Sequence, residues 1–478
     1  MKYTPKTKPF PHQARATRRA LAHRSYALFM EPRLGKTKAA LDYVGMCTTA
    51  WGSSRTLVIC PLFATDVWIS ELHKHYALPW QAETVDEEWG TSSPSQFYFI
   101  NREKLSRRFR KKGGSYQYPY VDQVEAFNPD FIIVDESHLF KRSGGVASQA
   151  LWRMVRRLRA KSRYTPRKPW VLLLTGTPNP KGWIDLFAQF RIMDEDVFGT
   201  TRSDFEERYC TYGWGSRRYT IVKYHHTREL LRKVNDHSYS VTAGQVGMAG
   251  RQFSQILWAT LPQSTRAAYN EMAEQFITEV EGEQISASNA GVKRLRLLQI
   301  AGGFTTEGKK IHGAKVAVLK DYLQNLFDQG ERVVIYARFT PEVGAALETA
   351  KSVGYKSLGV QGSTKPADRR NAVAALQGGK DPVALVFQVQ VGALSIELSR
   401  AAEVIFYSLP DSWDLYFQAR QRVLGPNQTR PVRYTHILSR RTVDRSVLSD
   451  LARKGDWHGT LMKDPRRYLY GGHNATTE

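Results

Sequence analysis

Short, almost uninterrupted apolar runs alternate along the first 200 residues with segments of helical periodicity. The runs lie at 26–30, 56–60, 97–100, 131–135 and 170–176. Strands that are buried on both faces of a parallel sheet show such continuous runs, whereas half-exposed strands alternate apolar and polar residues. The segments 36–46 and 64–76 between the runs are compatible with helices. This alternation predicts a doubly wound α/β layer.

The pattern changes at about residue 200 and later returns. We expect residues 202–300 to be mostly helical and polar, with an amphipathic helix over 264–280. Further apolar runs then lie at 332–339, 356–360, 383–389 and 403–409, and Gly354 and Gly378 mark helix ends between them. The pattern therefore predicts an α/β fold of two parallel-sheet lobes with a helical inter-lobe region. The expected domains are 1–200, 201–305 and 306–478.

The net charge is the one unusual bulk property. Lys and Arg number 69 against 45 Asp and Glu, which gives a formal charge of +24 and a pI near 9.8. Such an excess favours a polyanionic partner, because each neutralised phosphate releases counterions. A basic surface that only aids solubility is the alternative.

The cysteines and the apolar segments indicate the compartment. Cys47, Cys60 and Cys210 are scattered and form no CxxC pair, which argues against structural zinc and against a disulfide scaffold. No apolar run approaches the ~18 residues of a membrane span. The first residues lack the apolar core of a signal peptide. We expect a cytoplasmic protein.

A candidate phosphate-binding loop follows the first apolar run, with the sequence EPRLGKT over 31–37. Lys36 would neutralise the β- and γ-phosphates, Thr37 would hold Mg²⁺, and Gly35 lets the backbone approach the phosphates. Leu34 and Lys38 complete the segment assigned to nucleotide binding. The loop lacks the first glycine of the signature. Met30 occupies that position, and Arg33 replaces another frequent glycine.

Two further strand ends carry suitable chemistry. The run at 131–135 ends in Asp135, which would orient the metal, and Glu136, which would position or deprotonate the attacking water. The run at 170–176 ends with Thr175 and Thr177, whose hydroxyls can bond to the acidic pair and sense the γ-phosphate. Each motif alone is also compatible with an ordinary loop or turn, whereas their joint order favours a nucleotide site.

GKT, DESH and TGTP, in this order, resemble motifs I, II and III of superfamily-two helicases. CPLFATDVW over 60–68 resembles motif Ia of the Swi/Snf-type DNA translocases, which touches the DNA backbone in that family, and the segment 390–428 resembles motifs V and VI. The similarity covers residues 8 to 445. It implies two RecA-like lobes, ATP and Mg²⁺ as cofactors, and sequence-independent binding of DNA, mainly duplex, by a monomer. A compact form of this motor is typical of phages, which suggests a bacterial or phage-infected cytoplasm.

The resemblance also assigns individual residues. Gln13 would read adenine. Gln418 would contact the nucleotide, and Arg422 would stabilise the transferring phosphoryl group. His138 and Gly392, with Thr175 and Thr177, would couple hydrolysis to movement.

The clearest departure from the family lies in motif VI. Gly425 stands where a second arginine is expected, and Asn427 stands where the family has glycine. Three consequences stay open: Arg422 alone suffices, Arg420 or Arg430 takes the place of the missing arginine, or ATP turnover is slow. In motif V, Ser395 replaces glycine and Glu397 replaces asparagine.

Three segments are candidates for the DNA surface. Residues 101–114 hold seven basic residues and one acid, and residues 151–170 hold eight basic residues and no acid. Both are interleaved with aromatic residues, so we expect contacts to phosphates. Solvated helix faces are the alternative. The aromatic and basic segment 208–226 fits a DNA surface or packing between the lobes.

The sequence therefore predicts an ATP-dependent DNA translocase. A strand-separating, branch-migrating or annealing helicase acting on DNA or RNA fits the same motifs. A DNA-binding ATP sensor without hydrolysis is made conceivable by Gly425. The motor of a restriction system would need a nuclease on another chain.

Overall fold

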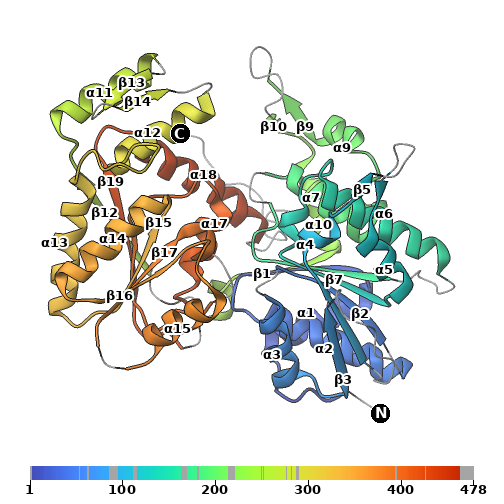
Figure 1. Cartoon of the computed structure of the whole chain (residues 1–478). Coiled ribbons are helices and arrows are strands. Elements are labelled where there is room, and N and C mark those ends of the chain that lie inside the picture. The colour runs from blue at the N-terminus through green and yellow to red at the C-terminus, as the bar shows by residue number, and fades with distance from the viewer. Residues whose placement is uncertain are drawn as a thin grey trace, which may run out of the picture. The chain divides into compact units, whose positions relative to one another are not determined.

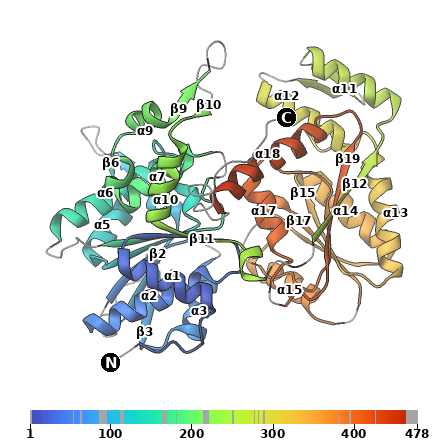
Figure 2. The same ribbon diagram turned by 180° about the vertical axis from the view of Figure 1, so that it is seen from behind.

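Two compact units make up the chain in the computed structural model (Figures 1 and 2). One is formed by residues up to Gly247 together with those from Asp456 on, and the other by Met248–Gly455. The structure describes residues 3–52, 54–61, 64–84, 95–110, 116–162, 169–179, 182–213, 221–248, 250, 252–275, 277–280, 283–286, 290–379, 381–392, 396–425 and 427–462. Each unit is built on a parallel sheet, so the predicted fold class is confirmed.

The first unit contains a seven-stranded sheet in the order β11-β1-β8-β7-β2-β4-β3. All its pairings are parallel. Its strands are β1 (Tyr26–Met30), β2 (Ser54–Ile59), β3 (Trp80–Thr84), β4 (Ser95–Ile100), β7 (Phe131–Asp135), β8 (Trp170–Thr175) and β11 (Ser238–Val241). The central strands β1 and β8 are buried along their whole length, as their continuous apolar runs predict.

Helices cover both faces of this sheet (Figure 1). One face carries α1 (Pro11–His23), α2 (Lys36–Trp51) and α3 (Thr65–His75). The other packs its core against α4 (Arg102–Leu105), α5 (Pro119–Phe127), α6 (Val146–Lys161), α7 (Ile184–Met193), α8 (Glu195–Phe198), α9 (Arg202–Tyr209) and α10 (Thr227–Asp236). Two small hairpins complete the unit, β5 (Phe109–Arg110) with β6 (Tyr116–Gln117) and β9 (Cys210–Tyr212) with β10 (Ile221–Tyr224).

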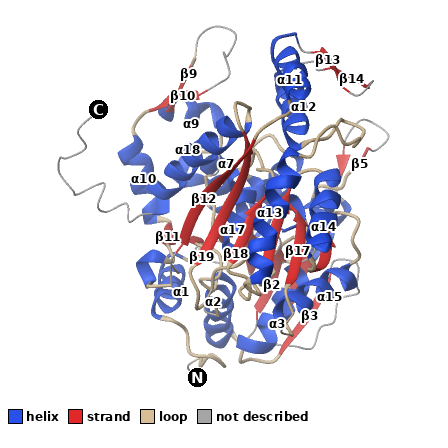
Figure 3. Ribbon diagram, turned by 90° about the vertical axis from the view of Figure 1, so that its left-hand side faces the viewer, coloured by secondary structure: helices blue, strands red, loops and turns tan. Residues whose placement is uncertain are grey.

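The second unit contains a six-stranded sheet in the order β12-β19-β18-β15-β17-β16, also entirely parallel. Figure 3 shows β12, β19 and β18 side by side. The strands are β12 (Gln252–Ala259), β15 (Val333–Ala337), β16 (Lys356–Val360), β17 (Val383–Gln388), β18 (Glu403–Phe406) and β19 (Val432–Ser439). The helices are α13 (Ala314–Asp328) and α14 (Thr340–Val353) on one face, α15 (Pro366–Gln377), α17 (Trp413–Gln421) and α18 (Asp444–Met462) on the other, and the short α16 (Val389–Gly392).

The segment expected to be mostly helical differs in part from its prediction. Its strands β11 and β12 join the first and the second sheet. The helix expected over 264–280 ends earlier, since α11 spans Gln263–Gln275 and β13 (Ile277–Val280) pairs with β14 (Glu283–Ser286). Helix α12 (Ala290–Gly302) follows. The domain limits expected near 200 and 305 stay a prediction. In the described part of the chain, no helix has the length and apolar character needed to cross a membrane.

Candidate active site

Three neighbouring strands of the first sheet bring the predicted chemistry to one edge. β8 lies between β1 and β7. Phe29 of β1 pairs with Thr175 at the end of β8, and Asp135 at the end of β7 pairs with Leu174. Because parallel strands end at the same edge, the loop after β1, the acidic pair after β7 and the threonines after β8 meet there.

The loop after β1 is held in place by α1. The carbonyl oxygen of Leu34 accepts a hydrogen bond from Gln13 Nε2 (3.1 Å) and lies 2.8 Å from His12 Nε2. Gln13 also caps its own helix, since its Oε1 accepts from the amide of Phe10 (2.9 Å). In this structure Gln13 therefore fixes the loop, and its predicted contact with adenine stays a prediction. The sequence did not predict a role for His12 at this loop, and the one signal for it was its position next to Gln13.

Gly35 makes the close approach of loop and helix possible. Its φ is +78°, a left-handed conformation, and a Cβ at this position would lie 2.1 Å from Gln13 Nε2. Helix α2 begins at the next residue, so its N-terminal amides and positive dipole end face the loop. Arg33 also has positive φ, at 67°. This geometry suits an anion at the loop.

The three polar side chains in the first turn of α2 differ in their placement. Lys36 Nζ donates to the carbonyl of Met30 (2.9 Å) and weakly to that of Glu31 (3.4 Å), so it lies over the loop. Thr37 is half-buried beside it. Lys38 is buried, and its Nζ forms an ion pair with Asp42 one turn along the helix. The Lys38 side chain is therefore engaged within α2, which leaves its backbone amide as its means of meeting a phosphate.

Asp135 and Glu136 form a tightly placed pair of carboxylates. Asp135 Oδ2 accepts from Trp68 Nε1 (2.9 Å), and its Oδ1 accepts from the amide of Glu136 (3.0 Å). Burial, and secondarily the charge of Glu136, raise the pKa of Asp135 to about 6. Neighbouring carboxylate oxygens are the ligands that Mg²⁺ prefers, and a cation would offset the cost of burying this charge. The acidic pair therefore fits a magnesium ion.

Trp68 is a site residue that the sequence did not single out. It belongs to the segment resembling motif Ia, whose expected partner is the DNA backbone. The structure instead shows its indole nitrogen orienting Asp135. Trp68 and Asp135 are 67 positions apart, so no local sequence pattern predicts this contact.

A chain of polar contacts links the acidic pair to the end of β8. His138 Nδ1 lies 3.2 Å from Glu136 Oε2 and 3.0 Å from Thr175 Oγ1. Thr175 Oγ1 in turn accepts from the amide of Thr177 (3.0 Å). The Thr177 hydroxyl is buried and has no hydrogen-bond partner among the described residues. These four residues thus lie together, with His138 between Glu136 and Thr175, while their role in coupling stays a prediction.

The predicted residues of motifs V and VI belong to the second unit. Gln418 lies on α17, and Arg422 directly follows it, its carbonyl accepting from the amide of Leu398 (2.9 Å). Gly392 ends α16. The approach of Arg422 to the loop of the first unit stays a prediction.

The two arginines considered as substitutes for the missing one have partners of their own. The guanidinium of Arg420 lies 4.2 Å from the ring centroid of Tyr434. Arg430 Nη1 donates to both carboxylate oxygens of Glu331, at 2.8 and 2.9 Å. Gly425 itself has φ +145°, a conformation that residues with a Cβ rarely adopt. The local backbone therefore has a conformation that glycine adopts readily and arginine does not.

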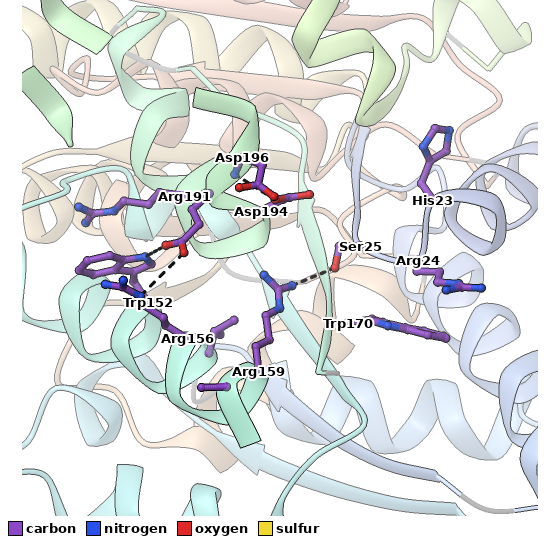
Figure 4. A pocket seen from close by; sticks show the side chains of 13 residues that line it. His23, Arg24, Ser25, Trp152, Arg156, Arg159, Trp170, Arg191, Asp194 and Asp196 are labelled. Atoms are coloured by element: carbon purple, nitrogen blue, oxygen red, sulfur yellow. Dashed lines mark hydrogen bonds and ion pairs between the residues drawn. The ribbon is translucent and has the colours of Figure 1, made fainter. Parts of the chain in front are cut away.

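Much of the basic segment 151–170 serves the first unit itself. Arg159 donates to the carbonyls of Pro169 and Met193 and to the hydroxyl of Ser25. Arg157 pairs with Glu125. Figure 4 shows Trp152, Arg156 and Arg159 on one side of a pocket, and Arg24 and Trp170 on the other. Its volume is about 540 Å³, and it lies near the start of β8, away from the phosphate loop.

Comparison with known proteins identifies the family. Residues 16–301 match the SNF2-related domain, and residues 314–425 match the helicase conserved C-terminal domain. The chain belongs to the SNF2-related family. The Swi/Snf-type membership predicted from the motifs is confirmed.

This SNF2-related chain resembles proteins of different origin. The DNA annealing helicase and endonuclease ZRANB3 of Mus musculus is 23% identical over 92% of this chain and 39% of its own length. Protein p41 of Acyrthosiphon pisum secondary endosymbiont phage 1 is 26% identical over 66% of this chain and 68% of its own. The chain spans less than half the length of the longer curated relatives it matches.

A solved structure aligns over nearly the whole SNF2-related chain. It is the SWI2/SNF2 ATPase core of Sulfolobus solfataricus in complex with dsDNA. The alignment covers 99% of this chain and 97% of that one, with 16% sequence identity and a TM-score of 0.42.

Proposed function

We propose that this SNF2-related protein is an ATP-dependent translocase that moves along duplex DNA. One observation carries the proposal: the phosphate loop, the acidic pair and Thr175 lie at the same edge of the first sheet, on three adjacent strands. A nucleotide-hydrolysing site needs an anion cradle, metal-binding oxygens and a base for water, and this edge supplies all three.

Each residue then has a role that its placement supports. The N-terminus of α2 and Lys36 bind the phosphates of ATP, with Gly35 permitting the close approach. Thr37 and Asp135 would hold Mg²⁺, which would neutralise charge on the phosphate oxygens. Glu136 accepts a proton from the attacking water. His138, beside both Glu136 and Thr175, passes the state of the site to the end of β8.

The second lobe supplies the remaining charge. In the proposed closed state Arg422 contacts the γ-phosphate, and Gln418 supports it from the same helix end. Closure of two lobes around ATP is a common means of completing such a site and of coupling hydrolysis to movement. The +24 charge supports DNA as the track.

The decisive test is ATP hydrolysis by the purified chain with a panel of nucleic acids. We expect closed circular duplex DNA to stimulate hydrolysis. Lys36→Ala should abolish nucleotide binding. Glu136→Gln should bind ATP yet hydrolyse it about 10²- to 10⁴-fold more slowly, because it lacks the general base. If wild type and Lys36→Ala hydrolyse ATP equally with saturating duplex DNA, the chain is an ATP sensor.

Movement is tested separately from hydrolysis. Displacement of a third strand from a triplex reports tracking along duplex DNA, whereas release of a labelled strand from a fork reports strand separation. We expect ATP-dependent triplex displacement by wild type and none by Glu136→Gln. Strand release or annealing without triplex displacement would favour the helicase alternative, and stimulation by RNA alone would rule out a DNA track.

A further inference from the structure

The hairpin β5–β6 has no part in the proposed nucleotide site. It lies between α4 and α5 along the chain, and Figures 1 and 2 show it beside α6 in the first unit. Phe109 pairs with Gln117, and Arg110 pairs with Tyr116, in antiparallel register. Directly paired residues point to the same side of a hairpin, so Arg110 and Tyr116 share one side while Phe109 lies on the other.

Its two aromatic rings are exposed. Phe109 is 59% exposed and Tyr116 is 48% exposed. The hairpin is nevertheless anchored, since Tyr118 and Tyr120 just beyond it pack against the core of the unit. Exposed aromatic rings on an anchored element can serve as stacking platforms for nucleic-acid bases.

Cations alternate with these rings. The guanidinium of Arg108 lies 4.0 Å from the centroid of the Tyr116 ring, and Lys104 Nζ lies 6.0 Å from that of Tyr120. Arg107 and Arg110 are exposed as well. Between 101 and 120 the one acid is Glu103, which bonds to its neighbour Arg102 (3.1 Å). The surface is therefore uniformly positive around its rings.

We infer that the β5–β6 hairpin binds unpaired bases of DNA where a single strand joins the duplex. Exposed rings stack on bases while interleaved cations contact the phosphates, which is the usual chemistry of single-strand binding. Bases inside a duplex already stack on one another, so the rings favour unpaired ones. This inference rests on the proposed function, because the two lobes would hold the adjoining duplex.

A binding experiment without nucleotide tests the inference directly. The full chain would be titrated against a fork carrying 2-aminopurine at its first unpaired position and against closed circular duplex DNA. For the double variant Phe109→Ala, Tyr116→Ala, we expect about tenfold weaker binding to the fork and loss of the stacking-induced fluorescence change. Binding to the closed duplex should change less than about twofold, since stacking on unpaired bases is not involved.

Two control proteins make the result specific. Phe253→Ala removes another exposed aromatic ring, 57% exposed on β12, and should leave both affinities unchanged. The variant Phe109→Trp, Tyr116→Phe keeps the rings and should retain fork binding, which separates stacking from misfolding of the hairpin.

Three outcomes would overturn the inference: equal losses on fork and closed duplex, no loss on either, or stronger competition by single-stranded RNA than by DNA of the same sequence. The second outcome would leave a protein partner as the occupant. Because binding is measured without ATP, the result is independent of hydrolysis. If duplex DNA stimulates hydrolysis but the double variant shows no fork-specific loss of binding, this inference alone is wrong. If the fork-specific loss is seen but duplex DNA does not stimulate hydrolysis, the proposed motor alone is wrong.

Discussion

Gly35 lies in the phosphate loop directly before α2, close to Gln13 of α1. Gly35→Ala forces a Cβ into a left-handed backbone, which costs about 1–2 kcal/mol, and drives it against Gln13. Gln13 then releases Leu34, and the loop loses its shape. We expect ATP affinity to fall at least about tenfold, because ~1.4 kcal/mol corresponds to a factor of ten. Calorimetric titration of ATP would measure this change.

Gly52→Ala is the matched control for that substitution. Gly52 has φ +83°, yet nothing lies within 4 Å of an added Cβ. It should therefore cost about 1–2 kcal/mol of stability and leave ATP affinity intact. An equal fall in ATP affinity for both variants would show that Gly35 acts through general stability and not through the loop.

The missing arginine of motif VI is a second question at the scale of one residue. Gly425→Arg restores the family side chain, but the φ of +145° is strained for any residue with a Cβ, at about 1–3 kcal/mol. We expect no gain in DNA-stimulated kcat and a lower melting temperature. Arg422→Ala, in contrast, should lower kcat. A rise in kcat of Gly425→Arg would show that the loop re-forms around the arginine.

The residues of the candidate site were predictable to different degrees. Lys36, Asp135 and Glu136 follow apolar strands, and parallel topology gathers strand ends, so pattern alone placed them together. The contacts of Trp68 and His12 were not predictable, because each depends on how a helix packs over a distant loop. The burial of the Lys38 side chain against Asp42 was not predictable for the same reason, since it depends on the packing of α2.

At the scale of elements, the sequence predicted most central strands and the edge strand β16, and it missed β19 and three edge strands. β1, β7 and β8 are buried on both faces and show continuous apolar runs. β3, β11 and β12 are edge strands, and β12 is largely exposed, so polar residues interrupt their patterns. Which segment completes a sheet edge depends on tertiary pairing, which local periodicity does not encode.

One buried histidine ties α17, the helix of motif VI, to the second sheet. His436 on β19 lies with its Nε2 2.9 Å from the hydroxyl of Tyr416 and with its Nδ1 3.2 Å from the carbonyl of Gln255. A neutral ring that donates from Nδ1 satisfies both contacts. Burial lowers the pKa of His436 to about 4.

This histidine predicts a specific loss of stability in acid. Below the unfolded pKa of ~6.5 the unfolded chain binds a proton that the folded chain refuses, so stability falls as pH drops from about 6.5 to about 4. At pH 5 this effect of His436 lowers the free energy of unfolding by about 2 kcal/mol. Urea unfolding at pH 7.5 and pH 5 should show this loss in wild type and a smaller one in His436→Asn. Identical losses would mean that other groups cause the acid sensitivity.

At the scale of the whole molecule, the charge of +24 predicts how DNA binding responds to salt. Contacts to 6–10 phosphates, a span common among DNA-binding proteins, would weaken binding by about 10³- to 10⁵-fold between 50 and 200 mM salt. We expect the affinity for closed duplex DNA to fall by at least about 10³-fold over this range of salt. Fluorescence anisotropy across a salt series measures the slope of log affinity against log salt.

One exposed arginine and one ion-paired arginine test which charges cause the slope of log affinity against log salt. Arg110 is exposed on the β5–β6 hairpin, so Arg110→Gln should reduce the slope measured on forked DNA by about one. Arg430 is held by both oxygens of Glu331, so Arg430→Gln should leave the slope unchanged although it removes the same charge. Equal reductions by the two variants would show that the total charge, rather than a placed DNA surface, governs binding. A reduction by Arg110→Gln alone would locate one phosphate contact on the hairpin and connect the long-range charge to a defined part of the first unit.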